Sequence, residues 1–420
     1  MAASPADVLL AVLGALPTGA DLAVVRRDPG QWVVGVAPDA RLTASGPEAL
    51  DALDRLDGAG GWWAGWLAYD LGRAVERVER RRPDDLGLPD LCLARFDVRV
   101  VVGPAGIRLE GDGPARPQLA AAARAARAGG GATRRPSGAG EPAPGLAPFT
   151  SGLTRPEFEA GVRAIVDLVR AGECYQVNLT RRLTSDVAAD PLALFGALVR
   201  QHPAPHAALL RLGDAAVVSA SPERFLRRLG DAVETRPIKG TAGRRAVLVH
   251  SAKDRAENVM ITDLARNDLG RVCRPGSVAV PALCAPERHP GLWHLVSTVT
   301  GRLRPGVGTA ALVRATFPPA SVTGAPKPRV LQAIEDLEPV SRGVYCGAVG
   351  WIDAGRGALD LNVAIRTFQV VGGRTHLGVG GGITVDSDPA AEWRETELKA
   401  ARLLAVAGAP APGRRIGVPA

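Results

Sequence analysis

Lysine is scarce in this 420-residue sequence, and a scarce nucleophilic side chain is a natural place to look for chemistry. It occurs at Lys239, Lys253, Lys327 and Lys399, while the other permanently cationic side chains are arginines. An ammonium group can lose its proton and become a nucleophile, whereas a guanidinium keeps its charge. Lys239, in TRPIKGTAGR (235–244), is therefore a candidate nucleophile. The alternative is that a compositional preference for arginine left four lysines without a shared role.

Carboxylates form a second pattern that suits catalysis, because they occur in two pairs with helical spacing. A spacing of three residues places both members of a pair on one face of a helix. The pairs are Asp254 with Glu257 in KDRAENVMITDLARND, and Glu392 with Glu395 in DPAAEWRETELKAARL. Oxygen ligands without a Cys or His cluster suit Mg²⁺, a hard cation that keeps waters and would need an anionic substrate to bridge. Two solvated acidic helix faces are the simpler alternative.

Several other polar groups suit the recognition of a small anion. The glycines at 380–382 can present N–H groups to a carboxylate as an anion-binding nest, although such runs are more often turns. Arg366, in the apolar segment LNVAIRTF, needs either a substrate carboxylate or a structural salt bridge. His294 lies among apolar residues, where a histidine is usually part of the core. Ser321 and Thr323 either face a ligand or cap the next helix.

Composition excludes several classes of protein. The formal net charge is +8, but the arginines are scattered and aromatic residues make up only 4% of the chain, so no nucleic-acid binding is expected. Five widely spaced cysteines without a C-x-x-C motif argue against a disulfide framework or a zinc site, and for a reducing compartment. Because we find neither a run of 18 apolar residues nor a basic n-region, we expect no membrane span and no signal peptide. These features predict a cytoplasmic protein.

Helical and extended segments are interspersed along the chain and must position these groups. Thr154 and Glu157 form a capping box, apolar residues follow at helical spacing, and Gly172 ends that helix before a strand. We expect further helices at 190–201, 253–267, 308–316, 326–336 and 389–407. We expect strands at 31–37, 62–71, 91–103, 206–212, 215–220, 223–228, 278–280, 293–302, 345–352, 358–370 and 374–379. Without regular alternation of helix and strand, this order favours an α+β fold with a mostly antiparallel sheet framework.

Composition also divides the chain into four parts. Residues 1–110 look folded, whereas 111–150 consist almost entirely of Ala, Gly, Pro and Arg. Such a segment buries little apolar surface, so we expect a disordered linker with at most one frayed helical turn. Order resumes at 151 and continues to 408, and residues 409–420 are expected to be a flexible tail.

Nine segments occur in the order that is typical of chorismate-utilising enzymes, and from about residue 154 to 407 the chain resembles that family. They are ECYQVNLT, SPERF, RPIKGT, ENVMITDLARNDLGRV, HLVSTVTGRL, FPPASVTGAPK, GVYCGAVGW, NVAIRTF and GGGITVDSDPAAEWRET. Within the family, the chain is most similar to the aminodeoxychorismate synthase component I group, which has an N-terminal segment like GGWWAGWLAYDLGR. The resemblance implies the anthranilate synthase component I-like fold, a large mostly antiparallel β-sandwich with helices packed outside. It implies a chorismate-binding catalytic domain at 151–408 and an N-terminal region of the same type at 1–110.

Three positions sort the members of this family. Isochorismate-forming members carry a lysine base where this chain has Gln176, which argues against addition of water. Anthranilate synthases read PIAGT where this chain reads PIKGT, and the lysine marks aminodeoxychorismate synthases. We find no segment like the LLES of tryptophan-sensitive anthranilate synthases, so feedback inhibition by tryptophan is not expected.

The resemblance further implies roles for individual residues. The implied catalytic residues are Lys239, Glu223 and His294, with Glu223 as acid and base at the C4 hydroxyl of chorismate. The implied direct Mg²⁺ ligands are Glu257 and Glu395, with Asp254 and Glu392 around them, and the metal binds the ring carboxylate. The implied substrate-binding residues are Thr241, Ser321, Tyr345, Arg366, Gly381 and Gly382. Of these, Tyr345 and Arg366 contact the enolpyruvyl carboxylate.

These roles are chemically coherent. The C4 hydroxyl is a poor leaving group, and protonation by Glu223 eases its departure. Mg²⁺ draws electron density through the ring carboxylate, so a neutral Lys239 amine can add at C2 before ammonia attacks C4 and expels the lysine. A lysine with an ordinary pKa near ~10.4 is protonated at neutral pH. Burial or a neighbouring cation, such as Arg236 or Arg244, must therefore lower it.

The expected product, 4-amino-4-deoxychorismate, belongs to 4-aminobenzoate and folate biosynthesis. We find no glutaminase signature, so a separate glutamine amidotransferase subunit is the expected source of ammonia, and the chain is expected to be a monomer or part of a heterodimer. The alternatives are anthranilate synthase component I, a non-catalytic chorismate-binding subunit and an arginine-rich nucleic-acid binder. Lys239 argues against the first, and the complete set of acidic positions argues against the second.

Overall fold

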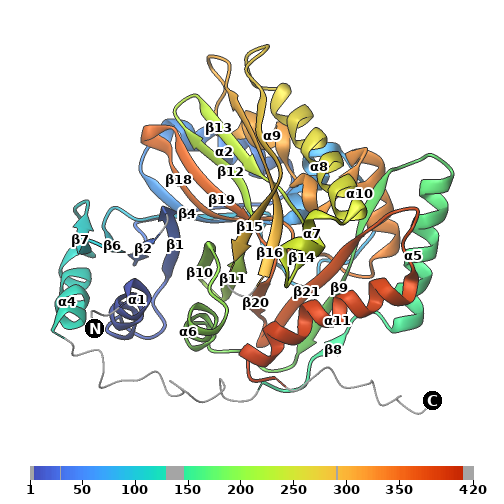
Figure 1. Cartoon of the computed structure of the whole chain (residues 1–420). Coiled ribbons are helices and arrows are strands. Elements are labelled where there is room, and N and C mark those ends of the chain that lie inside the picture. Colours follow the sequence, from blue (N-terminus) through green and yellow to red (C-terminus); the bar gives the residue numbers. More distant parts are fainter. Residues whose placement is uncertain (1–3, 29, 129–145, 290–291, 410–420) are drawn as a thin grey trace.

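Two large antiparallel sheets, packed face to face, form the framework of the molecule (Figure 1). The structure, a computed structural model, describes residues 4–28, 30–128, 146–289 and 292–409. Both sheets contribute to one core cluster, in which Val25 and Val33 of the first sheet meet Trp66 of the second. Helices lie along the outer sides, so the predicted α+β fold with an antiparallel β-sandwich and external helices is confirmed.

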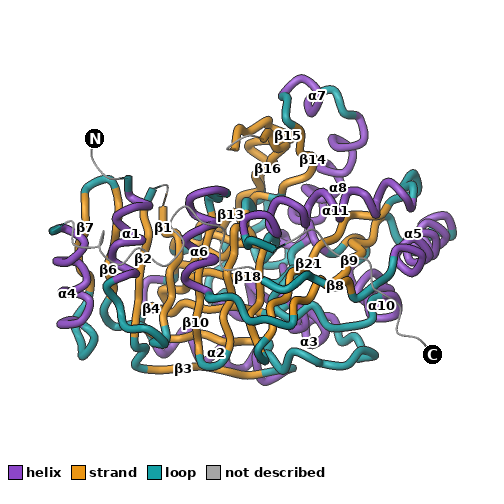
Figure 2. Tube along the Cα trace, turned by 90° about the horizontal axis from the view of Figure 1, so that it is seen from below, coloured by secondary structure: helices purple, strands orange, loops and turns teal. Residues whose placement is uncertain are grey.

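The strands of both sheets fill the middle of the molecule (Figure 2). In order across the first sheet they are β17 (Gly324–Ala325), β9 (Gln176–Ser185), β21 (Arg374–Ile383), β20 (Thr367–Val371), β11 (Ala215–Ser221), β10 (His206–Leu212), β1 (Leu22–Asp28), β2 (Gln31–Val36), β6 (Arg99–Gly103) and β7 (Gly106–Glu110), and β8 (Thr150–Ser151) pairs with β9. In order across the second they are β14 (Ile238–Ala242), β16 (Leu292–Arg302), β13 (Ala232–Arg236), β12 (Arg224–Leu229), β19 (Ala358–Val363), β18 (Ala348–Asp353), β4 (Trp62–Leu67), β5 (Leu91–Arg95) and β3 (Ala40–Ala44), and β15 (Ala279–His289) pairs with β16.

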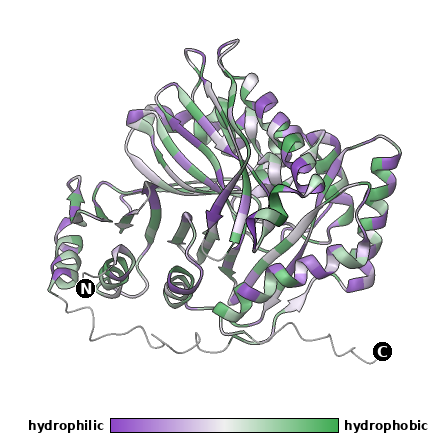
Figure 3. Ribbon diagram, viewed as in Figure 1, coloured by the Kyte–Doolittle hydropathy of each residue, from purple (hydrophilic) through white to green (hydrophobic). Residues whose placement is uncertain are grey.

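Amphipathic helices cover these sheets. They are α1 (Pro5–Gly14), α2 (Pro47–Ala59), α3 (Gly72–Glu76), α4 (Arg116–Arg127), α5 (Arg155–Arg170), α6 (Pro191–Gln201), α7 (Arg245–Val249), α8 (Ala252–Gly270), α9 (Thr309–Thr316), α10 (Lys327–Leu337) and α11 (Pro389–Val406), with short 3₁₀ turns η1 (Tyr69–Leu71), η3 (Ala320–Val322) and η4 (Ala354–Arg356). Hydrophobic and hydrophilic residues alternate along them (Figure 3), which is typical of helices with one buried face. Within the described ranges, no helix is long and apolar enough to cross a membrane.

Local signals explain where several helices begin. The predicted capping box is present, with Thr154 and Glu157 each accepting a backbone N–H bond at the start of α5. Asp190, Ser251 and Asp388 accept first-turn N–H groups of α6, α8 and α11. These signals lie within four residues of the helices they start. All the helices predicted after residue 154 are present with nearly the predicted bounds, including α9 and α10, whose first turns have no side-chain cap.

Three predicted strands are each divided in the structure. Residues 62–71 form β4 followed by the turn η1, and 91–103 form β5 and β6, which belong to different sheets. Residues 358–370 form β19 and β20, also in different sheets, with Arg366 between them at φ +51°. An apolar run keeps the same pattern when the chain bends from one buried sheet to the other, so periodicity did not reveal the break.

The expected disordered linker is wrong for at least part of 111–150. Residues Arg116–Arg127 form α4, and β8 follows at Thr150–Ser151. Leu119, Ala122 and Ala123 on α4 are buried against its neighbours, which include α1. Alanine is the strongest helix former, and a narrow stripe of small side chains is enough to pack one helix against another. Residues 129–145 of the linker and 410–420 of the expected tail lie outside the described residues.

The N-terminal region supplies strands to both sheets. Strand β1 pairs with β10 of the later chain, and β4 pairs with β18. The boundary predicted near residue 110 therefore does not separate two sheets, and the catalytic region depends on residues 1–110 for neighbours in its framework.

A buried ion network fastens the two regions together. The Glu338 carboxylate accepts bonds from Arg82 (3.1 Å) and Arg342 (2.6 Å), and also from the N–H and hydroxyl of Thr180 (both 2.9 Å). Arg82 comes from the N-terminal region, and all four side chains are less than 5% exposed. Charges at such depth must be paired, so the network holds β9, the end of α10 and the N-terminal region in one arrangement.

Removal of Glu338 should therefore destabilise the whole fold. Glu338→Ala would leave the buried Arg342 guanidinium without a carboxylate and Arg82 with Glu335 alone, and we expect the free energy of unfolding to fall by about 3–5 kcal/mol. Urea unfolding followed by circular dichroism measures this loss. Glu173→Ala, which removes an exposed partner of Arg329, is the control and should change stability by less than about 1 kcal/mol. Equal small effects of both variants would contradict the role of the network.

Candidate active site

Lys239 lies where the edge of the second sheet meets two strands of the first. It is half-buried on β14, opposite Gly382 of β21. A Cβ atom at Gly382 would lie 3.2 Å from Lys239 Nζ and 2.5 Å from Gln176 Nε2, and Gln176 begins β9. The amine and the amide therefore share the space above Gly382, and only glycine at that position leaves room for both.

Gln176 has the burial and the missing partners of a ligand-facing residue. Its side chain is fully buried, and neither amide atom has a hydrogen-bond partner among the described residues. An unsatisfied buried polar group costs about 1–3 kcal/mol, so native structures rarely keep one without a bound molecule or water. Sequence reasoning used Gln176 only to separate family members and missed it as part of the site.

The electrostatic surroundings of Lys239 favour its neutral form. Burial lowers the pKa of the amine, and the nearby Lys399 ammonium lowers it further, against the opposing pull of Glu257 and Glu223. Of the two arginines suggested to act on Lys239, Arg236 instead forms an ion pair with Glu287, and Arg244 is not among the main groups that shift the lysine pKa. The assisting cation is thus a lysine distant in sequence, which local inspection of TRPIKGTAGR could not identify.

Glu223 has the properties of a proton donor at neutral pH. It precedes β12, is 3% exposed, and accepts the Ile238 N–H at 3.3 Å. Burial raises its pKa to about 7, even though Ser321, Ile238, Lys239 and Arg366 all favour the carboxylate. A carboxyl group with such a pKa is partly protonated at neutral pH and can deliver a proton to a leaving group.

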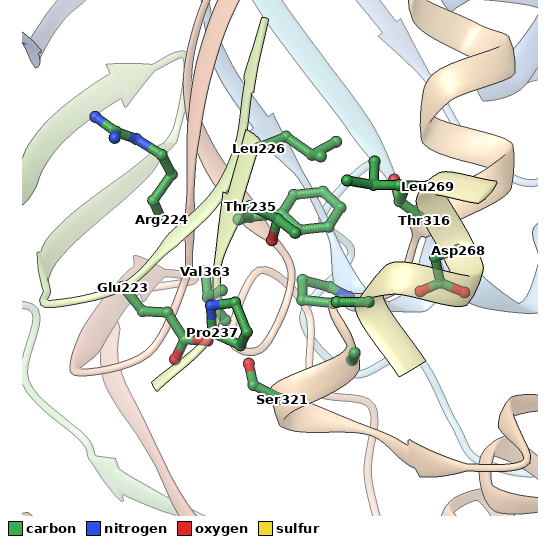
Figure 4. Close-up of a pocket in the computed structure, with 14 residues that line it drawn as sticks. Glu223, Arg224, Leu226, Thr235, Pro237, Asp268, Leu269, Thr316, Ser321 and Val363 are labelled. Carbon is green, nitrogen blue, oxygen red and sulfur yellow. The ribbon is translucent and has the colours of Figure 1, made fainter. Parts of the chain in front are cut away.

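Ser321 faces the same space as Glu223 (Figure 4). Its hydroxyl favours the ionised form of Glu223, yet forms no hydrogen bond of ordinary geometry with a described residue. Thr323, by contrast, donates its hydroxyl to the carbonyls of Pro319 and Ala320 and does not cap α10. Of the two hydroxyls in this loop, Ser321 is therefore the one available to a ligand.

His294 lies beside Lys239 on the neighbouring strand. Thr241 Oγ1 and His294 Nδ1 are 2.8 Å apart across β14 and β16, while the buried Nε2 has no partner among the described residues. Burial lowers the pKa of this histidine to about 3, with help from the Arg366 charge. His294 is therefore not a core histidine with both ring nitrogens hydrogen-bonded. A neutral ring with one nitrogen lacking a partner among the described residues suits contact with a ligand.

Arg366 is a half-buried cation without a carboxylate partner among the described residues. Burial lowers its pKa, its charge acts on Glu223, and its recorded side-chain contact is His202 Nε2 at 3.4 Å. No acidic side chain of the described residues lies within ion-pair distance, so the structural salt-bridge alternative is not observed. Its φ of +51° is strained for a residue with a side chain. An unpaired, strained arginine suits recognition of a substrate carboxylate.

The two predicted acidic pairs face each other from α8 and α11. Lys253 Nζ lies 3.9 Å from Glu257 Oε1 on α8 and 3.8 Å from Glu392 Oε1 on α11. Burial raises the pKa of both glutamates, and neighbouring carboxylates add to this effect. The four predicted metal-binding side chains are therefore brought together, with Asp254 on the first turn of α8 beside Gly240.

Lys399 connects the acidic cluster to the glycine strand. Its Nζ donates to the Gly380 carbonyl at 2.8 Å and lies 2.7 Å from Glu395 Oε1. Burial opposes ionisation of Glu395, but Lys399 outweighs it, so the pKa of this carboxyl is lowered. Lysine scarcity was the signal that could have identified Lys253 and Lys399 from the sequence, since it applies to all four lysines equally.

The acidic cluster has the chemistry of a magnesium site but not a closed cage. No group of three or more acidic, His or Cys side chains among the described residues converges closely enough to hold a metal by itself. Magnesium keeps several waters and binds through one or two carboxylates plus substrate oxygens, so an open cluster of carboxylates fits this ion. The four carboxylates of the cluster are only partly neutralised by Lys253 and Lys399, which leaves net negative charge for a cation.

The glycine run does not form the expected nest, and the predicted role of Tyr345 is not tested by the contacts that it makes. Residues 380–382 lie in the extended strand β21, paired with β9, and do not form a nest. Tyr345 packs its ring against Gly378, and its pKa is raised well above the ordinary value by burial and by Cys346. No recorded contact joins Tyr345 to Glu223 or Lys239, so its role at the substrate stays a prediction.

Comparison with known proteins agrees with this geometry. The family model for chorismate binding enzymes matches residues 22–405. Aminodeoxychorismate synthase component 1 of Klebsiella aerogenes is 40% identical over 357 residues, covering 81% of this chain and 76% of that protein. Anthranilate synthase component 1 of Thermus thermophilus is 40% identical over 355 residues, with the same coverage.

A solved structure extends the likeness to the fold. Anthranilate synthase component I from Streptococcus pneumoniae superposes with a TM-score of 0.76 at 26% identity, over 90% of this chain and 93% of that chain. The family model and these relatives all span most of the chain, and the residues matched by the family model include the Lys239 strand and the acidic pairs of α8 and α11. The chain therefore belongs to the chorismate-binding enzyme family.

Proposed function

We propose that this protein is aminodeoxychorismate synthase component I, which converts chorismate and ammonia to 4-amino-4-deoxychorismate. The observation that carries the proposal is Lys239, a half-buried amine with a lowered pKa beside Gln176 and within the electrostatic reach of Glu223. Overall identity does not separate the two activities, since relatives of both kinds are 40% identical to the chain. A nucleophilic side chain at position 239 does separate the two activities, because anthranilate synthases carry alanine there.

The bound substrate is held by its two carboxylates. Arg366 binds the enolpyruvyl carboxylate, which supplies the anionic partner that the half-buried guanidinium lacks. Glu257 and Glu395 would hold Mg²⁺ with Asp254 and Glu392 around it, and the ion would withdraw electron density through the ring carboxylate. The ring then lies between these anchors, with Glu223 toward C4 and Lys239 toward C2.

The reaction proceeds by two displacements. Glu223 protonates the C4 oxygen, the Lys239 lone pair forms a bond to C2, and the ring double bonds shift so that C4 releases water. Ammonia then forms a bond to C4, the double bonds shift back, and the C2–N bond breaks to regenerate the lysine. The first displacement needs Lys239 as a free amine and Glu223 as an acid, which are the forms that burial favours, and the proton that the bound lysine nitrogen loses can return to Glu223 before the second displacement.

The proposal includes a separate glutamine amidotransferase subunit that supplies ammonia in the cytoplasm, for 4-aminobenzoate and folate synthesis. The relatives are named as component 1 of their enzymes, which supports the presence of a second component. We find no glutaminase motif in this sequence. Anthranilate synthase component I is the second candidate, supported by the equal identity of the Thermus thermophilus protein. The complete set of acidic side chains argues against a non-catalytic subunit.

Product identity tests the proposal directly. With chorismate, Mg²⁺ and ammonium, we expect a non-aromatic product that yields 4-aminobenzoate only after a lyase is added. Chelation of the metal should stop the reaction. Fluorescent anthranilate that forms without a lyase would favour the second candidate.

The Lys239 variants test the proposed nucleophile. Lys239→Ala and Lys239→Arg should both lose most of the turnover, because neither side chain offers a free amine. Mass spectrometry of the wild-type enzyme with chorismate but no ammonia should detect chorismate less one water on the Lys239 peptide. Unchanged turnover in Lys239→Ala would rule out covalent catalysis.

The pH dependence should report Glu223. Its proton is present below its pKa of about 7 and absent above it, so kcat should fall as pH rises through about 7. Glu223→Gln should be slower by about 10²–10⁴-fold and lose this fall. Measurement of kcat from pH 5 to 9 for both enzymes decides the matter. A fall that persists in the variant would assign it to another group.

Gly382→Ala tests the shared space above β21. The added methyl would collide with the Gln176 amide and press on Lys239 Nζ, so turnover should fall by at least about tenfold while the fold is kept. Gly58→Ala on α2, where nothing lies within 4 Å of the new methyl, is the control and should be fully active. Steady-state kinetics and thermal unfolding of both variants provide the measurement.

A further inference from the structure

Lys253 occupies an unusual position between the two acidic helices. Its ammonium lies 3.9 Å from Glu257 and 3.8 Å from Glu392, so it faces one carboxylate on each helix. Both distances exceed those of a hydrogen bond, and the lysine side chain is 55% exposed. The contact is therefore a weak, hydrated bridge and not a fixed structural link.

The other lysine of the cluster is held quite differently. Lys399 donates to the Gly380 carbonyl at 2.8 Å and contacts Glu395 at 2.7 Å, so two direct bonds fix its position. Lys399 belongs to the framework of the site, whereas Lys253 has no hydrogen bond recorded for its ammonium among the described residues.

Electrostatics explains why some cation must stand between Glu257 and Glu392. Each of these carboxylates is partly buried, and the charge of Glu392 adds to the cost of ionising Glu257. Without a positive charge between them, the two helices would repel each other at this point. A divalent ion would supply that charge when it binds, so the lysine is needed only in its absence.

We propose that Lys253 is a displaceable counter-cation, which holds Glu257 and Glu392 together in the metal-free enzyme and moves into solvent when the divalent ion binds. The inference rests on the magnesium dependence in the proposed function. It also explains the choice of residue in a chain that otherwise uses arginine. A guanidinium would bind a carboxylate through two parallel bonds and would be harder to displace.

Metal affinity in the absence of substrate tests this role without reference to turnover. Binding of Mn²⁺, followed by electron paramagnetic resonance, should be about two- to fivefold tighter in Lys253→Gln, which is the range that an exposed ion pair supports. Lys253→Arg should bind Mn²⁺ more weakly than the wild type, although its charge is the same. Arg255→Gln, an exposed charge on the same helix, is the control and should stay within about twofold.

Chemical labelling provides an independent readout, made simple by the presence of only four lysines. Acetylation of the wild-type enzyme, read by mass spectrometry, should become faster at Lys253 when Mg²⁺ or Mn²⁺ is added, because the ammonium is released. Lys399 also contacts a proposed ligand, Glu395, but the Gly380 carbonyl holds its ammonium, so its rate should rise less than that of Lys253.

The outcomes separate this inference from the proposed function. If the wild-type enzyme binds no Mn²⁺, the magnesium dependence fails, and the counter-cation role fails with it. If Mn²⁺ binds but both Lys253 variants match the wild type and labelling is unchanged, only the counter-cation role is overturned. A third outcome would also overturn the counter-cation role. In it, Lys253→Gln binds Mn²⁺ more tightly, but Lys253→Arg binds it with the same affinity as the wild type, so Lys253 acts on the metal only through charge repulsion.

Discussion

The proposed chemistry of the site depends on one electrostatic requirement, which is that an acid and an amine are uncharged within reach of each other. In water, a glutamate and a lysine at neutral pH would both be charged and would pair. Burial raises the pKa of Glu223 and lowers that of Lys239, because removal of water penalises the charged form of each group. The two charges favour each other, so the site must keep them from becoming an ion pair. The Lys399 ammonium opposes protonation of Lys239 and so works in that direction.

The fold meets this requirement by joining segments that are remote in sequence. Lys239 comes from the edge of the second sheet, Gln176 and Gly382 from the first, and Ser321 from a loop before α10. Water is excluded from the place where these segments meet only if the two sheets keep their relative position. The buried network around Glu338 and the N-terminal strands fix that position, although neither touches the reacting groups. Stability of the framework and the pKa values of the site are thus parts of one arrangement.

The sequence predicted local features of the fold, but it did not predict which residues meet across the sheets. The start of α5 follows from Thr154 and Glu157, which lie three residues apart, and the acidic pairs follow from helical spacing. The break between β19 and β20, by contrast, lies inside one stretch of mostly buried residues, so no exposed turn segment marks it. The helix α4 was missed because its packing needs only small side chains. Gln176 was seen as a family marker, since its burial and missing partners become visible only when β9 meets β21.

The four lysines of this chain are not only few, but also lie in or beside the candidate site. Lys239, Lys253 and Lys399 surround one site, and Lys327 is buried with Asp268 Oδ2 (2.7 Å) and the Thr316 carbonyl (2.8 Å), two residues that line the cavity beside Glu223. A compact ammonium can donate in three directions from a single atom, release a proton, or leave a carboxylate more readily than a planar guanidinium. Each of these properties is of use in the reaction proposed for this site, in which a dianion binds and a transient bond forms. In a chain so rich in arginine, the positions that keep lysine are those where a charge alone is not sufficient.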